Sequence, residues 1–396
     1  MPGARSVDGA RPCGALVLVW LAAGGCGEPE RPGFLMTDAG RPPSDAAPRL
    51  EGGCSGPPEL DAGDVCGNLV LPIDVPRRNV YFLIDRSGSM NERLEGGTYS
   101  KYISARIALK ELLVQIGHRV HYGAAVFPGL SATDSCATGI EVFPTLPGDP
   151  LGAACGADVG PNLRSLLLGL GELGAHSGTP ISPTLTAVSP IVTELPGETT
   201  VILATDGAPN CNPDARCAPD ECVANLEGAR FGDQVCGVDL DCCDPELLPD
   251  SGYYCVDRAA SEAVLADWSA QGIRTFVIGM PGSERYASVL DRFAEAGGTA
   301  RDAERRYYSV GNVAELTTTL LQIGASVAVS CSIELEAAPP DPSLVNVYFD
   351  LQLVPGDGWR WTATNALEIQ GSACAQLKSG AVRQIQVVAG CPTVVY

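Results

Sequence analysis

Apolar runs and segments with helical spacing alternate through the middle of the chain. The runs at 80–85, 122–127, 200–205 and 273–279 are typical of strands that are buried on both faces of a sheet. Between the first two runs, apolar residues recur every three or four positions over 102–116, which favours a helix. This alternation predicts an α/β fold, with a doubly wound, mostly parallel sheet covered by helices on both faces.

The same pattern predicts the remaining elements of this sheet. Pro144 and Pro147 beside the short apolar run 140–143 favour an edge strand, because proline cannot donate to a sheet ladder. Gly297-Gly298 favours the end of a helix. We also expect a last strand at 307–310 and helices at 163–173, 181–195, 258–271, 288–296 and 314–325.

Residues 207–256 interrupt the alternation. The segment is loop-like and holds seven cysteines, and up to Asp250 it has ten acidic residues against two arginines, a local charge of −8. So many cysteines predict a disulfide-stapled insertion rather than a linker. Asp239, Asp241 and Asp244 are compatible with a separate Ca²⁺ site, although a solvated acidic loop is the simpler interpretation.

Residues 327–396 have a different pattern. From Val345 to Leu353 every second residue is apolar, which is the period of a strand. Further strand candidates lie at 333–336, 359–364 and 383–388. We expect a small β-rich C-terminal unit.

The first residues are organised like a secretory signal. Arg5 and Arg11 precede a short apolar stretch at 15–23, and Gly24-Gly25-Cys26 follows. Small residues before a cysteine resemble the lipobox of bacterial lipoproteins, so we expect residues 1–26 to be a lipoprotein-type signal with Cys26 lipidated. An ordinary cleaved signal is the alternative. The stretch is too short to span a bilayer.

The segment after the signal predicts a tether. Residues 27–77 are rich in Pro, Gly, Asp and Ala, which favours a flexible connection to a membrane. Gly27, directly after the lipidated cysteine, is compatible with sorting to a Gram-negative outer membrane. The sequence therefore predicts an exported protein of the cell envelope, with a periplasmic or secreted protein as the alternative.

The cysteine content supports export. Of sixteen cysteines, Cys13 and Cys26 belong to the leader, which leaves an even number for disulfides in an oxidising compartment. The three histidines show no zinc-ligand spacing with cysteines, which disfavours structural zinc sites. The disulfide candidates are Cys54, Cys66, Cys136, Cys155, Cys211, Cys217, Cys222, Cys236, Cys242, Cys243, Cys255, Cys331, Cys374 and Cys391.

The odd cysteine counts suggest one long-range bond. If Cys54–Cys66 and Cys136–Cys155 are local pairs, seven cysteines remain in the insertion and three in the tail. Neither group can then pair entirely within itself. We expect one insertion cysteine to bond to the tail.

Charge and missing motifs exclude several classes of function. The net charge of −21 disfavours nucleic acid and anionic membrane surfaces as partners, so the N-terminal lipid is the expected membrane contact. The sequence has no phosphate-binding Gly-x-x-x-x-Gly-Lys-Ser/Thr loop, no Gly-x-Ser-x-Gly elbow and no His-Glu-x-x-His motif. We therefore expect a protein that is not an enzyme.

Oxygen-bearing side chains follow two of the predicted strands. Asp85-Arg86-Ser87-Gly88-Ser89 comes directly after the first apolar run, and Thr205-Asp206-Gly207 ends a later one. Ligands of doubly wound sheets bind where strands end at their carboxyl edge. Carboxylates and hydroxyls in that place suit a hard divalent cation.

These motifs, together with Thr179-Pro180 before a helix, resemble the von Willebrand factor A domain over residues 78–326. In that family the three loops form the metal-ion-dependent adhesion site. The resemblance implies that Ser87, Ser89 and Thr179 bind the cation directly. It also implies that Asp85 and Asp206 act directly or through water. Mg²⁺ is the expected metal, with Mn²⁺ or Ca²⁺ also possible.

The resemblance implies a binding protein of the cell envelope. A metal with an open coordination position attracts an Asp or Glu carboxylate of a protein partner, without bond-making. The alternatives are a non-catalytic accessory subunit of an enzyme complex and a structural envelope protein whose metal only braces the loops. A simpler view of the motif residues is that they are ordinary turn and cap residues. The acidic insertion would lie beside the site, as a rim that selects partners or as a source of an internal capping carboxylate.

Overall fold

The computed structural model describes residues 69–392, apart from 72, 75–77, 95–96, 132, 151–152, 155–156, 172–177, 238, 329, 379–381 and 383. The signal, Cys26 and most of the predicted tether lie outside the described residues. Cys54, Cys66 and Cys155 do so as well. The expected Cys54–Cys66 pair therefore lies outside the described residues, whereas the expected Cys136–Cys155 pair is wrong, because Cys136 bonds to Cys211.

Within the described residues, one sheet has the strand order β10-β9-β6-β3-β4-β5. Neighbouring strands pair in parallel, except that β5 is antiparallel to β4 at the edge. The strands are β3 (Arg78–Asp85), β4 (His121–Phe127), β5 (Ile140–Pro147), β6 (Glu198–Thr205), β9 (Arg274–Gly279) and β10 (Tyr308–Ser309). The predicted doubly wound sheet and its proline-containing edge strand are confirmed.

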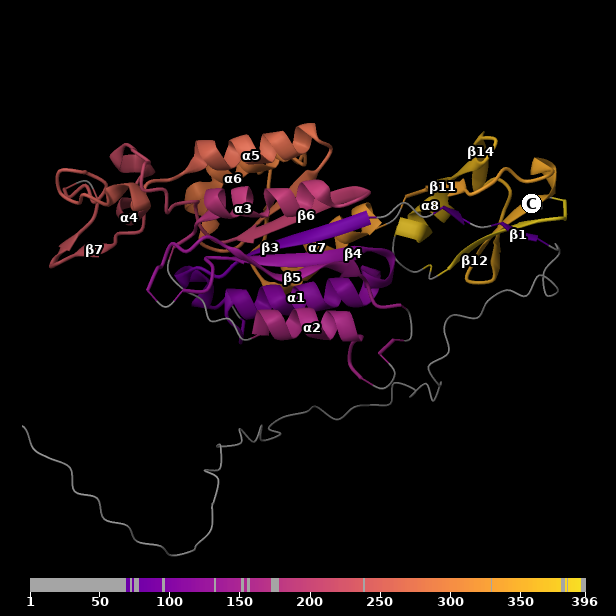
Figure 1. Ribbon diagram of the computed structural model, residues 1–396, viewed down its shortest axis with the longest axis horizontal. Coiled ribbons are helices and arrows are strands. Elements are labelled where there is room, and N and C mark those ends of the chain that lie inside the picture. Colours follow the sequence, from indigo (N-terminus) through magenta and orange to yellow (C-terminus); the bar gives the residue numbers. More distant parts are fainter. Residues whose placement is uncertain are drawn as a thin grey trace, which may run out of the picture. The chain divides into compact units, whose positions relative to one another are not determined.

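Helices cover both faces of this sheet, as Figure 1 shows. On the central strand β3, Val80, Phe82 and Ile84 pack with α1, α2 and α7, whereas Tyr81 and Leu83 pack with α3, α5 and α6. Both sets are buried because side chains of a strand alternate between faces. The helices are α1 (Lys101–Ile116), α2 (Pro161–Gly171), α3 (Ile181–Glu194), α5 (Arg258–Ala270), α6 (Ala287–Ala296) and α7 (Val313–Ala328).

The insertion after β6 is ordered by short elements and disulfides. It contains α4 (Val223–Leu226), the hairpin of β7 (Arg230–Phe231) and β8 (Gln234–Val235), and 3₁₀ turns at Pro219–Glu221 and Ser251–Tyr254. Three disulfides lie inside it: Cys217–Cys255, Cys222–Cys243 and Cys236–Cys242. The prediction of a disulfide-stapled insertion is confirmed.

The expected bond between insertion and tail is wrong. The seventh insertion cysteine, Cys211, bonds to Cys136 in the β4–β5 loop, while Cys331 and Cys374 pair within the tail. Cys391 is also disulfide-bonded. The physical reason is topological. β4 and β6 both flank β3, so the loops that follow them meet at one edge of the sheet despite 75 residues of sequence separation.

Two of the insertion aspartates stabilise turns. Oδ1 of Asp241 accepts hydrogen bonds from Nδ2 of Asn225 at 2.8 Å and from the backbone N–H of Cys243 at 3.0 Å. Oδ1 of Asp244 accepts from the backbone N–H of Glu246 at 2.8 Å. These contacts agree with the simpler interpretation of an acidic loop rather than a separate Ca²⁺ site.

The C-terminal unit comprises two antiparallel sheets, β1-β16-β12-β13 and β14-β15-β11-β2, in the described part of the chain. Its later elements are β11 (Ser332–Leu335), β12 (Val345–Phe349), β13 (Gln352–Val354), β14 (Trp359–Ala363), β15 (Ala366–Ile369), α8 (Gly371–Lys378) and β16 (Ile385–Ala389). The alternating run that begins at Val345 is a hairpin, because Asp350 and Leu351 adopt positive φ angles of 46° and 71° and turn the chain.

The predicted tether ends earlier than residue 77. β1 (Leu69–Leu71) pairs antiparallel with β16, and β2 (Ile73–Asp74) pairs antiparallel with β11. These residues therefore belong to the C-terminal unit, because main-chain pairing with distant strands fixes them. Among the described helices, none is long and apolar enough to cross a membrane.

Candidate metal centre

The carboxyl ends of β3 and β6 bring the predicted metal ligands to one edge of the sheet. Asp85 is the last residue of β3, and Asp206 directly follows β6, which pairs in parallel with β3. Ser87 and Ser89 lie at the start of the 3₁₀ turn Gly88–Asn91. Asp85, Ser87 and Asp206 are at most 2% exposed.

Hydrogen bonds connect these side chains into one cluster. The hydroxyl oxygens of Ser87 and Ser89 are 3.1 Å apart, and the Ser89 hydroxyl donates to Oδ1 of Asp206 over 2.8 Å. Oδ1 of Asp85 accepts from the backbone N–H of Ser87 at 2.7 Å. Four of the five predicted ligands therefore belong to one hydrogen-bonded cluster.

Thr179, the fifth predicted ligand, lies in the loop before α3. Asn210 holds its backbone from both sides: the N–H of Thr179 donates to Oδ1 of Asn210 at 2.8 Å, and its carbonyl accepts from the N–H of Asn210 at 3.0 Å. The Thr179 hydroxyl lies 3.7 Å from where a Cβ on Gly207 would stand. Thr179 is thus beside the residue that follows Asp206, and Asn210 is a positioning residue that the sequence did not reveal.

Asp85 is held in an unfavourable environment for a free carboxylate. The Thr205 hydroxyl donates to its Oδ2 at 2.5 Å, which fixes the second oxygen of the carboxylate. Burial, followed by repulsion from Asp206, raises the pKa of Asp85 to about 7. Burial also raises the pKa of Asp206, although Lys101 opposes that shift. Two buried carboxylates at one strand edge call for a compensating positive charge.

Lys101 supplies part of the positive charge that compensates the two carboxylates, and its role was not predicted from the sequence. Its ammonium donates to Oδ2 of Asp206 at 2.8 Å and to Oε2 of Glu92 at 2.9 Å. The Lys101 side chain is only 3% exposed. The signal in the sequence is a lysine at the start of a helix, where the helix dipole disfavours a cation.

The neighbouring Arg86 orders the next loop. Its guanidinium is 1% exposed and donates to the carbonyl oxygens of Pro128 at 3.1 Å and Gly129 at 3.2 Å. The loop after β4 is thereby tied to the Asp85 turn. The Cys136–Cys211 disulfide ties the same loop to the segment after β6.

The donor set fits a hard divalent cation. Every candidate ligand atom is an oxygen, from two carboxylates and three hydroxyls, which is the chemistry that Mg²⁺, Mn²⁺ and Ca²⁺ prefer. The burial of Asp85 and Asp206 in one cluster supports the fit, because a cation there would relieve the repulsion between the two carboxylates that helps to raise the pKa of Asp85. Lys101 neutralises one unit of that charge and leaves the other for a metal.

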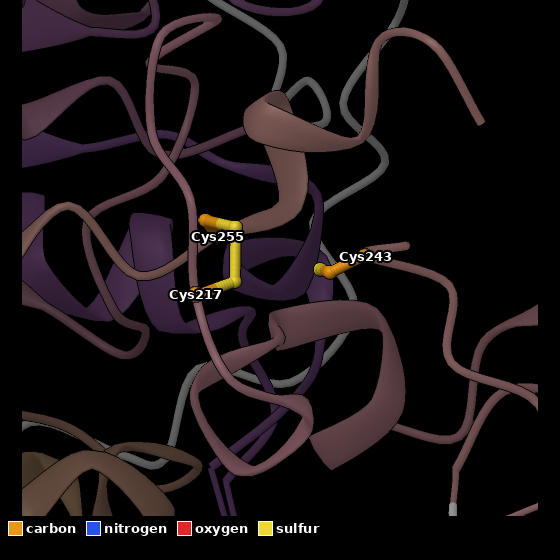
Figure 2. A group of neighbouring side chains, drawn as sticks. All are labelled: Cys217, Cys243 and Cys255. Atoms are coloured by element: carbon orange, nitrogen blue, oxygen red, sulfur yellow. A yellow bond between two sulfur atoms is a disulfide. The ribbon is translucent and has the colours of Figure 1, made fainter. Parts of the chain in front are cut away.

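The cysteines of the insertion do not form a second metal site. Sulfur atoms of Cys217, Cys243 and Cys255 lie within 4.8 Å of one another. Figure 2 shows these three side chains and the bond between the first and the last of them. Cys217 and Cys255 are bonded to each other, and Cys243 is bonded to Cys222. Sulfur in a disulfide has no thiolate to offer a metal, so this cluster is a structural staple.

Comparisons with known proteins give structural likenesses of low identity. The sequence matches no protein-family model and no curated protein. The pilus adhesin SpaC of Lactobacillus rhamnosus GG aligns over 82% of this chain and 38% of its own, with 15% identity and a TM-score of 0.42. The PilB minor pilin of Streptococcus sanguinis aligns over 64% of this chain and 62% of its own, with 16% identity and a TM-score of 0.42.

A third similar structure is the vWF domain of the type V pili tip protein Mfa5 from Porphyromonas gingivalis. It aligns over 64% of this chain and 96% of its own, with 13% identity and a TM-score of 0.42. The chain spans less than half the length of SpaC. The strand order and the helix placement of this chain define its doubly wound fold.

The stability of the metal-free protein should depend on the ionisation of Asp85. Its folded pKa of about 7 lies above the ordinary value of 3.8, so the folded state holds a proton that the unfolded chain has released. Stability in EDTA should therefore fall as the pH rises from about 4 to about 7, by on the order of 1 kcal/mol for each pH unit in that range. Thermal unfolding across this range measures the effect.

Asp85→Asn is the matched variant, since it keeps the shape and removes the charge. It should flatten the pH dependence and melt at a higher temperature than the unmutated protein at pH 8 in EDTA. Equal dependence of stability on pH in the two proteins would show that the pKa of Asp85 is not raised in the absence of metal.

Proposed function

We propose that this chain is an exported, non-catalytic binding protein that recognises a carboxylate of a protein partner through a divalent cation. Asp85, Ser87, Ser89, Thr179 and Asp206 would hold the cation, with Mg²⁺ the first candidate and Mn²⁺ or Ca²⁺ the others. The single observation behind the proposal is the convergence of buried carboxylates and hydroxyls at one carboxyl edge of a parallel sheet.

The low charge of the ligand set suits recognition better than storage of the metal. Three of the five ligands are neutral hydroxyls, and Lys101 offsets one of the two carboxylates. A bound cation therefore keeps positive charge and attracts an anionic oxygen to any open coordination position. An Asp or Glu side chain of a partner supplies such an oxygen without any bond-making.

The insertion stands where it can select the partner. A groove of about 570 Å³ runs between the insertion and the β4–β5 loop, and its lining includes Gly178 and Asn210 beside Thr179. Asp134, Glu227 and Asp250 also line it, and its lining holds no lysine or arginine among the residues that the structure describes. We infer that the insertion is a rim that favours partners with basic residues near the recognised carboxylate.

Export fits the covalent structure of the chain. Disulfides occur in the insertion, between the insertion and the β4–β5 loop, and in the C-terminal unit. Such a framework forms and persists in an oxidising compartment. We propose a location in the cell envelope, with the N-terminus anchored through lipid on Cys26.

Removal of the metal or of Asp85 should abolish partner capture. In a pull-down from envelope extract, the unmutated protein should retain partners in Mg²⁺ and lose them in EDTA, since the carboxylate contact requires the cation. Asp85→Ala should retain none in either buffer. Asp302→Ala removes an exposed carboxylate outside these loops and is the matched control. Partner capture that persists in EDTA would instead favour the alternative that the metal only stabilises the loops.

Deletion of the insertion should change partner selection and leave the sheet folded. The two ends of the insertion lie side by side, because the N–H of Asp257 donates to the carbonyl of Pro209 at 2.8 Å. Residues 212–255 can therefore be replaced by a short Gly linker while Cys211 keeps its bond to Cys136. We expect unchanged Mg²⁺ affinity in calorimetry and a changed set of captured partners. An identical set of captured partners would contradict the proposal that the insertion selects partners.

Lipid anchoring predicts the behaviour of Cys26→Ala. Without the acceptor thiol the protein should move from the membrane fraction to the soluble fraction after cell lysis. Cys13→Ala changes a cysteine in the same leader and should leave the protein in the membrane fraction. Retention of Cys26→Ala in membranes would rule out this anchor.

A further inference from the structure

One of the three lysines of the chain is buried in the candidate metal centre. The sequence contains Lys101, Lys110 and Lys378, whereas almost all other basic residues are arginine. Lys101 is 2% exposed, Lys110 is half-buried and Lys378 is exposed. A buried ammonium needs close partners, because desolvation disfavours its charge.

Carboxylates supply those partners. The ammonium lies 2.8 Å from Oδ2 of Asp206, whose side chain is fully buried, and 2.9 Å from Oε2 of Glu92, which is 69% exposed. These two charge-assisted hydrogen bonds provide the compensation that a buried ammonium requires.

Surrounding backbone encloses this ion pair. The N–H of Lys101 donates to the carbonyl of Glu92 at 2.8 Å, which closes the loop before α1. A Cβ on Gly282 would lie 3.1 Å from the carbonyl oxygen of Asp206 and 3.4 Å from the ammonium nitrogen. Gly282 has a φ of 111°, so glycine suits both the conformation and the close approach.

The charge balance of the centre depends on this lysine. Asp85 and Asp206 contribute two buried negative charges, Lys101 contributes one buried positive charge, and water screens the exposed Glu92. A divalent cation then leaves the buried centre with one net positive charge. Without the lysine the same loaded centre would be neutral, so it would bind the cation more tightly and attract an anion less strongly.

Lys101 also limits how Asp206 can serve a metal. Oδ2 of Asp206 is occupied by the ammonium, and Oδ1 accepts from Ser89. The ammonium therefore competes with a cation for Oδ2 of Asp206, which disfavours coordination of one cation through both oxygens. Ca²⁺ commonly takes a carboxylate through both oxygens, whereas Mg²⁺ keeps waters and few protein ligands.

We propose that Lys101 is a specificity-determining residue of this centre: it lowers the affinity for the cation, disfavours Ca²⁺ relative to Mg²⁺, and keeps the bound cation attractive to a carboxylate ligand. This inference rests on the proposed function, because it presumes that the five oxygen ligands hold a metal. It extends that function by naming what sets the metal preference and the strength of the carboxylate contact.

Calorimetric titration of the full chain with Mg²⁺ and with Ca²⁺ tests the inference. Lys101→Met keeps the length of the side chain and removes its charge. Lys110→Met makes the same change of net charge on the same helix, outside the centre, and is the control. For Lys101→Met we expect Mg²⁺ affinity to rise by about tenfold or more, and Ca²⁺ affinity to rise further. Lys110→Met should stay within about twofold of the unmutated protein for both metals.

Acetate serves as a probe of the open coordination position. If acetate binds the loaded centre, adding it must raise the apparent Mg²⁺ affinity, by thermodynamic linkage. We expect that rise in the unmutated protein and in Lys110→Met, and a clearly smaller rise in Lys101→Met. If Lys101 were merely structural, its loss would weaken both metal binding and acetate binding. The inference instead predicts that metal binding becomes stronger while the effect of acetate becomes smaller.

The outcomes separate the inference from the proposed function. An unmutated protein that binds neither metal overturns the proposed function. An unmutated protein that binds Mg²⁺, with Lys101→Met showing equal or weaker affinity and an equal acetate effect, overturns only the role of Lys101.

A measurement on the unmutated protein applies even if Lys101→Met does not fold. With ¹⁵N-labelled lysine, three side-chain signals are expected, and Lys110→Met and Lys378→Met assign them. The ammonium of Lys101 should exchange slowly with water and should shift when Mg²⁺ saturates the centre. A Lys101 signal that Mg²⁺ leaves unchanged would contradict a position beside the cation.

Discussion

Parallel pairing of β3 and β6 is the constraint on which the candidate centre depends. Ile84 is in register with Ala204, so both strands end at the same height. Each strand leads directly into an aspartate, and the two carboxylates are buried within one cluster. The surrounding donors can be understood as a response to this placement: two serine hydroxyls, the Thr205 hydroxyl and the Lys101 ammonium all approach carboxylate oxygens or one another.

The faces of the sheet and its carboxyl edge differ in their surroundings. Helices α1, α2 and α7 cover one face and α3, α5 and α6 the other, so the central strand β3 is buried on both faces. The buried carboxylates of Asp85 and Asp206 and the buried ammonium of Lys101 lie at the carboxyl edge. Each of these charged groups has a hydrogen-bond partner there.

Much of the fold and of the candidate centre could be predicted from local patterns. Apolar runs marked the strands and helical spacing marked the helices. The candidate ligands Asp85, Ser87, Ser89, Thr179 and Asp206 belong to short motifs beside those elements. Lys101, Thr205 and Asn210 escaped prediction because their roles arise from contacts between segments. Thr205 contacts Asp85 although 120 positions separate them in the sequence, and Lys101 contacts Asp206 at a separation of 105 positions.

Long-range pairing also explains the corrections to the expected disulfides and to the end of the tether. Cys136 meets Cys211 because β4 and β6 flank β3, a neighbourhood that counting cysteines does not show. β1 resembles the end of a tether until β16, from the opposite end of the chain, provides its partner. In both cases the local sequence is ordinary, and the sheet topology supplies the missing information.

The insertion leaves the sheet domain and returns to it at a single point, where Asp257 meets Pro209. The loop-closure cost of such an excursion rises only slowly with its length. Changes inside the excursion therefore need not disturb the strand ends that hold the acidic cluster. The stapled loop can therefore vary in length and sequence among relatives of this chain without a change at the strand ends.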